Sequence, residues 1–186
     1  MENTDYLKII QKYIPPHTFA YYIYIIHVTL VTEKALEIAR RLKLSLAQQR
    51  FIEEASMLHD IGVIRVNSKE IGCFGELPYI LHVSEGRKIL EKEGLPLHAR
   101  IAENHISVGG LSMAEIVKAK MPLPHRDMLC ETIEEKIISY ADLFYSKNPD
   151  KLWQRKTIPQ IREKAKHYGK RQERLFEKWY KEFEEK

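Results

Sequence analysis

Residues 51–62 read Phe-Ile-Glu-Glu-Ala-Ser-Met-Leu-His-Asp-Ile-Gly, a short segment that ends in a histidine and an aspartate. Its apolar residues follow helical spacing and share one face: Phe51, Ile52, Ala55 and Leu58. The segment therefore predicts a helix that ends with His59 and Asp60 on or beside its buried face. A His-Asp pair alone is too common to indicate a function, so the surrounding sequence has to supply the context.

Helical patterns continue on both sides of this segment. Four capping boxes, in which a Ser or Thr and a later Glu or Gln satisfy N–H groups of the first turn, mark helix starts. They are Ser45 with Gln48, Ser112 with Glu115, Thr132 with Glu135 and Thr157 with Gln160. Helices are expected at 5–13, 18–42, 46–60, 79–93, 97–106, 112–118, 132–147 and 158–184. Because no segment alternates convincingly with period two, the expected fold class is all-α, a helical bundle.

Further side chains able to bind a metal stand on or beside the apolar faces of other predicted helices. They are His27, His82, His105 and Asp142. His27, for example, shares a helix face with Leu30 and Val31. A single histidine beside an apolar face is more often an ordinary core residue than a ligand. Several on separate helices, with carboxylates that are costly to bury unpaired, favour a shared metal site in the bundle core.

The order of these residues, one histidine, a His-Asp pair and a late aspartate, resembles that of the HD superfamily of metal-dependent phosphohydrolases. The segments Met57–Gly62 and Tyr140–Asp142 resemble that family in their flanking residues too, and the resemblance extends over about residues 20–146. It implies an HD-domain helical bundle with two metal ions. The implied ligands are His27, His59, Asp60 and Asp142 for the first ion, and His82 and His105 for the second, with Asp60 bridging the two.

The resemblance also implies a reaction: hydrolysis of a phosphoester or phosphoanhydride of a nucleotide or similar small molecule, with His59 and Asp60 as catalytic residues. Two metal ions about 3.5–4 Å apart suit this chemistry because they activate water and neutralise charge on the phosphate. Mixed imidazole and carboxylate ligands favour divalent transition metals, here two ions of Fe, Mn, Co, Ni or Zn. The alternative is a non-catalytic module of the same fold that senses a nucleotide or a metal.

Basic residues near the motif in sequence are candidates for phosphate contact, since a planar guanidinium can bind two phosphate oxygens. The candidates are Arg65, Arg87, Lys88, Arg126 and Lys136. Many members of the superfamily have a lysine directly after His-Asp-Ile-Gly, where this sequence has Val63. Asn104 and His105 stand where relatives that cleave cyclic dinucleotides have two adjacent histidines, so cyclic di-GMP is not the expected substrate.

Charge divides the chain into two parts. Residues 147–186 hold 13 Lys/Arg and 7 Asp/Glu, a net of +6, whereas residues 1–146 carry a net of −2. We expect an HD-type domain over 1–146 and a basic amphipathic helical extension over 147–186 that packs on the same domain. Interspersed charges of this kind usually form a solvated helix face. The expected partner is therefore a small phosphorylated molecule, a nucleotide first of all. Binding of a nucleic acid by the basic C-terminal helix is a less favoured alternative, and a homodimer stays open.

Three features bear on location. Two cysteines are too few for a disulfide framework, which favours a reducing compartment. The longest apolar run, about residues 19–31, is shorter than the ~20 residues of a membrane span. Residues 1–5 lack the basic start of a secretory signal. We therefore expect a cytoplasmic protein with no membrane attachment.

Overall fold

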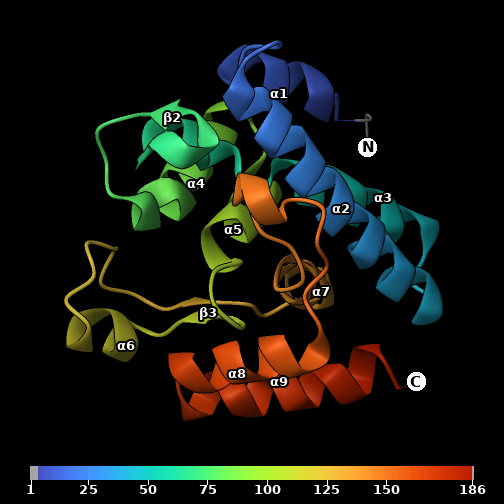
Figure 1. The fold of residues 1–186 in the computed structure, drawn as a ribbon. Coiled ribbons are helices and arrows are strands. Elements are labelled where there is room, and N and C mark those ends of the chain that lie inside the picture. The colour runs from blue at the N-terminus through green and yellow to red at the C-terminus, as the bar shows by residue number, and fades with distance from the viewer. Residues whose placement is uncertain (1–3, 186) are drawn as a thin grey trace.

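The computed structural model describes residues 4–185 (Figure 1). Residues 1–3 and residue 186 lie outside the described residues. They belong to the predicted domain over 1–146, to the N-terminal stretch examined for a secretory signal, and to the predicted extension over 147–186. The α-helices are α1 (Tyr6–Tyr13), α2 (Phe19–Arg41), α3 (Leu46–Leu58), α4 (His82–Lys92), α5 (Pro96–Asn104), α6 (Met113–Lys118), α7 (Ile133–Asp142), α8 (Ile158–Tyr168) and α9 (Lys170–Phe183). Short 3-10 helices are η1 (Ile61–Arg65), η2 (Lys69–Ile71), η3 (Tyr79–Leu81) and η4 (Pro149–Lys151).

Strands contribute only two short antiparallel ladders to the described residues. The paired strands are β1 (Asn67–Ser68) with β2 (Cys73–Phe74), and β3 (Gly110–Leu111) with β4 (Met128–Leu129). The predicted all-α fold class is therefore confirmed. No helix within residues 4–185 is both long and apolar enough to cross a membrane.

Side-chain caps begin the helices where the capping boxes predicted. Ser45, Ser112 and Thr132 each accept a hydrogen bond from the backbone N–H three residues further on. The Gln or Glu at that position accepts one in return from the N–H of the cap residue. At the start of α8, the Thr157 N–H donates to Gln160 Oε1 at 2.8 Å. These local pairs satisfy backbone donors of the first turn, which have no partner inside the helix.

The prediction of one helix over 158–184 was wrong, because the chain turns back at Gly169. This residue has φ 137°, a conformation that favours glycine. α9 then runs back alongside α8 (Figure 1), and an ion pair between Arg162 and Glu177 joins the two helices. Each half is amphipathic by itself, so the spacing of apolar residues does not reveal that the halves face each other.

The helix predicted over 132–147 also ends early, at Asp142. Residues 143–157 are irregular apart from η4. The Lys156 ammonium donates to the carbonyl oxygens of Leu143 and Tyr145, at 3.3 and 2.6 Å. The loop is thereby fastened to the end of α7, and its residues lie over that end.

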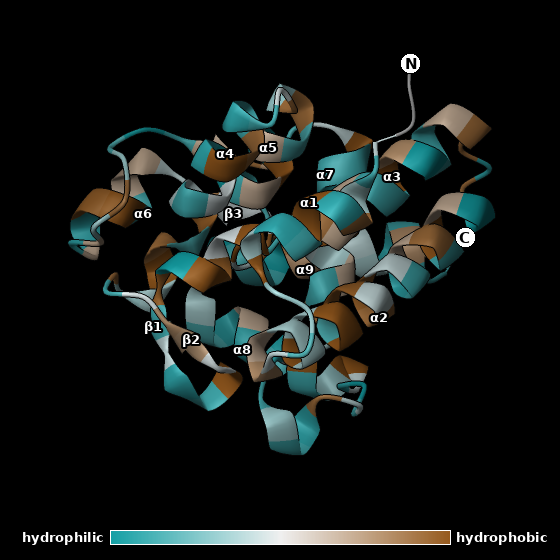
Figure 2. Cartoon of the chain, turned by 90° about the horizontal axis from the view of Figure 1, so that it is seen from above, coloured by the Kyte–Doolittle hydropathy of each residue, from teal (hydrophilic) through white to brown (hydrophobic). Residues whose placement is uncertain are grey.

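Three clusters of buried apolar side chains hold the helices together. The largest joins α2, α3 and α7 to the α8–α9 pair, and Tyr140, Phe176 and Trp179 are buried within it. The second lies among α1, the first half of α2, η1 and parts of α4 and α5. The third lies under α6. Hydrophobic and hydrophilic residues share the helices in a mixed pattern rather than in separate blocks (Figure 2), as expected for helices with one buried face.

One glycine permits a close contact that positions the site described below. A Cβ at Gly62 would lie 2.0 Å from the His82 carbonyl oxygen and 2.3 Å from the Gly86 nitrogen. η1 therefore packs directly against the backbone of α4, which a larger residue would prevent. The contact brings Asp60, just before η1, beside His82, the first residue of α4.

Candidate metal centre

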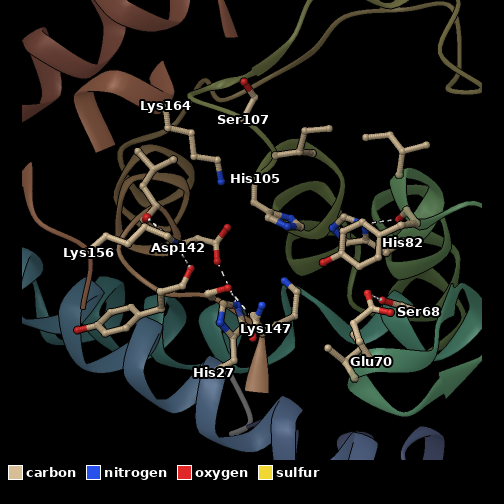
Figure 3. Close-up of a pocket in the computed structure, with 18 of the residues that line it drawn as sticks. His27, Ser68, Glu70, His82, His105, Ser107, Asp142, Lys147, Lys156 and Lys164 are labelled. Carbon is tan, nitrogen blue, oxygen red and sulfur yellow. Dashed lines mark hydrogen bonds and ion pairs between the residues drawn. The ribbon is translucent and has the colours of Figure 1, made fainter. Parts of the chain in front are cut away.

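Six side chains from separate helices and helix ends converge beside a cavity of about 420 Å³, and Figure 3 labels the four that line it. Their positions are His27 in the middle of α2, His59 at the end of α3, Asp60 before η1, His82 at the start of α4, His105 at the end of α5 and Asp142 at the end of α7. His59 and Asp60 are completely buried, and the other four line the cavity. The structure thus brings together all six residues that the sequence singled out as metal ligands.

Distances divide the six into two groups that share Asp60. On one side, His27 Nε2 lies 3.1 Å from both Asp60 Oδ2 and Asp142 Oδ1, and His59 Nε2 lies 3.3 Å from Asp60 Oδ2. On the other side, the Nε2 atoms of His82 and His105 each lie 3.5 Å from Asp60 Oδ1. The two oxygens of Asp60 therefore face different sets of imidazoles, which is the arrangement that a bridging carboxylate needs.

Backbone carbonyls orient three of the four imidazoles. The Nδ1 atoms of His59, His82 and His105 lie 2.6, 2.7 and 2.9 Å from carbonyl oxygens three residues earlier in the chain. A carbonyl can only accept a hydrogen bond, so each of these Nδ1 atoms carries a proton and each Nε2 faces the cluster. Such a hydrogen bond on the far nitrogen is the usual support of a metal-binding histidine.

Several buried polar atoms at the centre have no hydrogen-bond partner within residues 4–185. They include both ring nitrogens of His27, Nε2 of His59 and Oδ1 of Asp60. Buried polar atoms without partners are costly, and native proteins rarely leave them so. A cation would satisfy the converging lone pairs together, so the residues present fit one or two divalent metal ions.

The surrounding charges keep the carboxylates ionised. Burial disfavours the charged form of Asp60, but Lys147 and His59 outweigh burial and hold the pKa of this carboxyl well below its usual range. At Asp142 the neighbouring imidazoles likewise outweigh burial and lower the pKa. Burial lowers the pKa of His82 to about 3, although Asp60 opposes this change. At neutral pH these three groups hold the protonation states that metal ligands require.

His59 behaves differently from His82. Burial opposes protonation of its ring, but the charges of Asp60 and Asp142 outweigh burial and raise the pKa of His59 to about 10. A proton on this imidazole offsets part of the negative charge of the two carboxylates. A bound cation would supply the same compensation and displace that proton.

A residue that sequence analysis did not single out, Lys147, reaches this centre from the loop after α7. Its ammonium makes an ion pair with Asp60 Oδ2 and lies 6.0 Å from the centre of the Tyr79 ring. Burial opposes its charge, but Asp60 outweighs burial and raises the pKa of Lys147. The sequence placed this residue at the end of a predicted helix in a basic segment, and neither feature indicates that it points into the site.

Two further lysines line the same cavity (Figure 3). Lys156 is tied to carbonyl oxygens at the end of α7, and burial together with the charge of Lys164 lowers its pKa to about 8. Lys164, on α8, is exposed and points into the cavity, and no carboxylate within residues 4–185 pairs with it. All three lysines come from the C-terminal segment with the excess of positive charge.

The five basic residues expected to contact phosphate do not line this cavity. Three of them are engaged elsewhere: Arg87 with Glu91 and the buried Glu103, Arg126 with Glu103, and Lys88 with Glu85. Arg65 is exposed on η1, and Lys136 is half-buried on α7. Nearness to the motif along the chain therefore did not place these side chains near the cavity, because carboxylates outside it bind the Arg87, Arg126 and Lys88 side chains.

A helical bundle with this His/Asp cluster is the pattern that the HD resemblance implies, and comparison with known proteins agrees. The family model described as HD domain matches residues 24–146. The chain belongs to the HD domain family, which is associated with metal-dependent phosphohydrolases.

Two curated relatives are both described as tRNA (cytidine(56)-2'-O)-methyltransferase. The protein from Picrophilus torridus is 32% identical over 117 residues, which are 62% of this chain and 29% of that protein. The protein from Thermoplasma volcanium is 32% identical over 121 residues, which are 64% of this chain and 31% of that protein. The chain thus matches less than a third of the length of either relative. No solved structure matches the chain significantly.

Proposed function

We propose that this chain is a metal-dependent phosphohydrolase that acts on a small phosphorylated molecule, a nucleotide first of all. The observation that supports this most directly is the position of Asp60, whose two oxygens face two separate imidazole sets. The first ion would be held by His27, His59, Asp60 and Asp142, and the second by Asp60, His82 and His105. A shared carboxylate between two metal positions is a recurrent arrangement for phosphate chemistry.

Two divalent ions of Fe, Mn, Co, Ni or Zn bound there would lower the pKa of a water molecule and offset the negative charge of the phosphate. Hydrolysis adds one water across a phosphorus–oxygen bond: the water oxygen joins phosphorus, and the leaving oxygen gains a proton. The chain's own residues contribute position and charge. His59, His82 and His105 are held in place by backbone carbonyls, so the centre is rigid before substrate arrives.

The lysines of the C-terminal segment fit the role of phosphate ligands. Lys164 is directed into the cavity and has no carboxylate partner among the described residues, and Lys147 lines the cavity beside Asp60. An ammonium group stabilises phosphate oxygens as a point charge and tolerates different phosphate orientations. Together the two lysines would bind the phosphate group beside the six residues that would hold the metal ions.

Two other functions have to be weighed against hydrolysis, a non-catalytic sensing role and the activity in the names of the two relatives. A sensing module would bind the metal or nucleotide without turnover. The completeness of the ligand set favours an enzyme, since binding alone does not require a shared carboxylate and three imidazoles held by backbone carbonyls. Methylation of tRNA, the activity in the names of the two relatives, is not extended to this chain, because the match covers less than a third of those proteins.

The test is phosphate release by the full chain loaded anaerobically with Fe²⁺ or Mn²⁺, against phosphomonoesters, phosphodiesters and phosphoanhydrides. We expect turnover in wild type and a loss of at least about 100-fold in Asp60→Asn, which removes the bridging charge. Asp150→Asn, at an exposed position outside the cavity, is the matched control and should retain activity. A folded Asp60→Asn protein with undiminished turnover contradicts the proposal, and wild type that binds nucleotides without any turnover supports the sensing module.

A further inference from the structure

A second cavity, of about 590 Å³, adjoins the candidate metal centre. Four residues line both cavities: Ile80, Ile106, Ser107 and Tyr168. Ile106 directly follows His105, so the wall between the cavities begins at a candidate metal ligand. The volume lies in the range of small-molecule binding sites, which is about 300–1,000 Å³.

The second cavity differs in character from the first. Apolar side chains of Ile80, Ile106, Leu111 and Met121 contribute much of its lining, whereas the first cavity is the one that holds histidines and an aspartate. Leu111 is buried in the cluster under α6, which makes this wall part of the fixed core. A molecule that spans both cavities would place an anionic end among cations and an apolar end against these side chains.

Three polar side chains on the α6–α9 side of the second cavity, Glu115, Arg171 and Gln172, are paired with one another, and the exposed Lys118 and Lys170 also line it. Glu115 accepts hydrogen bonds from Arg171 at 2.9 and 3.0 Å and from Gln172 at 2.8 Å. The Arg171 guanidinium also donates to the Gly110 carbonyl oxygen. These contacts join α6 and β3 to the start of α9, so they make the cavity wall rigid and leave no unpaired carboxylate there to repel a phosphorylated ligand.

Ser107 is the unusual residue at the junction. Its φ is +61°, a left-handed conformation that costs a residue other than glycine roughly 1 kcal/mol or more. Its hydroxyl is buried and has no hydrogen-bond partner in the described part of the chain. Figure 3 places Ser107 at the edge of the pocket, two residues after His105. Strained residues with unused polar groups cluster at ligand sites, where the ligand supplies the missing partner.

We propose that the second cavity binds a flat heteroaromatic ring carried by the phosphorylated substrate, with Ser107 Oγ bonded to the substrate and the Tyr168 ring against it. This inference rests on the proposed function only in placing the phosphate group of the substrate at the metal centre. A ring system of this kind is apolar on its faces and polar at its edge, which suits apolar walls and one free hydroxyl. Tyr168 is 41% exposed and lines both cavities, so its ring is accessible to stacking.

The test compares ligands of equal phosphate charge by calorimetry on the full chain loaded with Mn²⁺. The probes are adenosine and cytidine 5′-monophosphates and glycerol 3-phosphate, which lacks a ring. We expect at least one nucleotide to bind with a Kd at least tenfold below that of glycerol 3-phosphate. Equal Kd values for all three contradict the inference.

Two variants on α6 and its end locate the effect. Ala119→Trp introduces a bulky side chain at an exposed position that lines the second cavity, and should abolish the preference for the nucleotide. Val117→Trp adds the same bulk at an exposed position on the same helix, outside both cavities, and should retain it. A preference that survives Ala119→Trp unchanged contradicts the inference.

Ser107→Gly separates a binding role from a structural one. Glycine adopts positive φ without strain, so we expect an unchanged or higher thermal midpoint together with a several-fold weaker nucleotide affinity and an unaltered affinity for glycerol 3-phosphate. Unaltered nucleotide affinity contradicts the role of the hydroxyl. If the chain prefers nucleotides but releases no phosphate with any of the metals, the result supports the ring-binding role of the second cavity and contradicts only the hydrolase proposal.

Discussion

Asp60 and the lysine beside it explain how so much charge is buried in a small bundle. The carboxylate has no exposed surface and is surrounded by four imidazoles and the Lys147 ammonium. An isolated buried charge costs several kcal/mol, but each charge here has an opposite one within contact distance. Binding of a divalent ion replaces these internal pairs with stronger ligand bonds, so metal and fold stability are coupled.

At the residue scale, Lys164 offers a prediction about phosphate binding. Lys164→Gln removes a cation that is directed into the cavity and has no carboxylate partner among the described residues. We expect KM for a phosphorylated substrate to rise roughly five- to tenfold, about 1 kcal/mol, with kcat little changed. Steady-state kinetics of the metal-loaded chain measure both constants.

Lys166→Gln is the control for this variant, because Lys166 lies on the same helix but outside the cavity, 3.8 Å from Glu163. It should leave KM unchanged. Equal effects of the two substitutions would indicate general charge attraction and contradict a specific contact from Lys164.

Sequence analysis identified the six clustered residues but not the lysines, and the reason is physical. His27, His59 and Asp142 sit on helix faces whose apolar spacing can be counted along the chain. Lys147 lies in the irregular loop after α7, and Lys164 lies on α8, which that loop positions, so both depend on a path set by tertiary packing. The spacing of residues within a loop carries no comparable signal.

At the scale of elements, Glu115 gives a prediction about pH. Burial favours its neutral form, but Arg171 and the Ser112 backbone outweigh burial and lower its pKa to about 2 from the usual 4.5. A folded-state pKa below the unfolded one stabilises the protein above about pH 4.5, and this contribution is lost as pH falls toward 2. The change corresponds to at most about 3 kcal/mol, reduced by partial solvent exposure.

Urea unfolding at pH 7 and pH 3 tests the contribution of these contacts between Glu115 on α6 and the start of α9. Glu115→Gln should lower stability at pH 7 and lose part of the pH dependence seen in wild type. Glu173→Gln, at a half-buried position of α9 outside the second cavity, is the control and should show the wild-type dependence. Identical pH profiles for Glu115→Gln and wild type contradict the account of these contacts.

Local sequence predicted the helix starts better than the helix ends. Ser45, Ser112 and Thr132 form capping boxes with residues three positions away, so both partners stand within one turn. The ends of α7 and α8 depend on distant contacts instead: the Lys156 ammonium binds carbonyls at the end of α7, and α9 packs on α8 after Gly169. A short stretch of sequence does not contain the distant residues that end these helices, so it does not predict where they end.

At the scale of the whole molecule, the α8–α9 pair shares the largest core cluster with α2 and α7. The two tryptophans provide a matched test, because Trp179 on α9 is 2% exposed and Trp153 is 67% exposed. We expect Trp179→Ala to lower the free energy of unfolding by about 3–5 kcal/mol, since it leaves a cavity in the core. Trp153→Ala should change it by less than about 0.5 kcal/mol.

Urea titrations of both variants measure these changes. Similar, small effects of the two substitutions would mean that residues 158–185 are held only loosely on the bundle. In that case the lysines of the C-terminal segment could not be held rigidly over the metal centre.

The most direct test of the account is the metal content of the full chain, purified without chelator or nickel resin and measured by elemental analysis. Six converging residues with a shared Asp60 predict close to two transition-metal ions per chain, and His82→Ala should reduce this to about one. Absence of bound metal, even after anaerobic reconstitution with Fe²⁺ and Mn²⁺, or a single ion that is unaffected by His82→Ala, would contradict the two-metal centre.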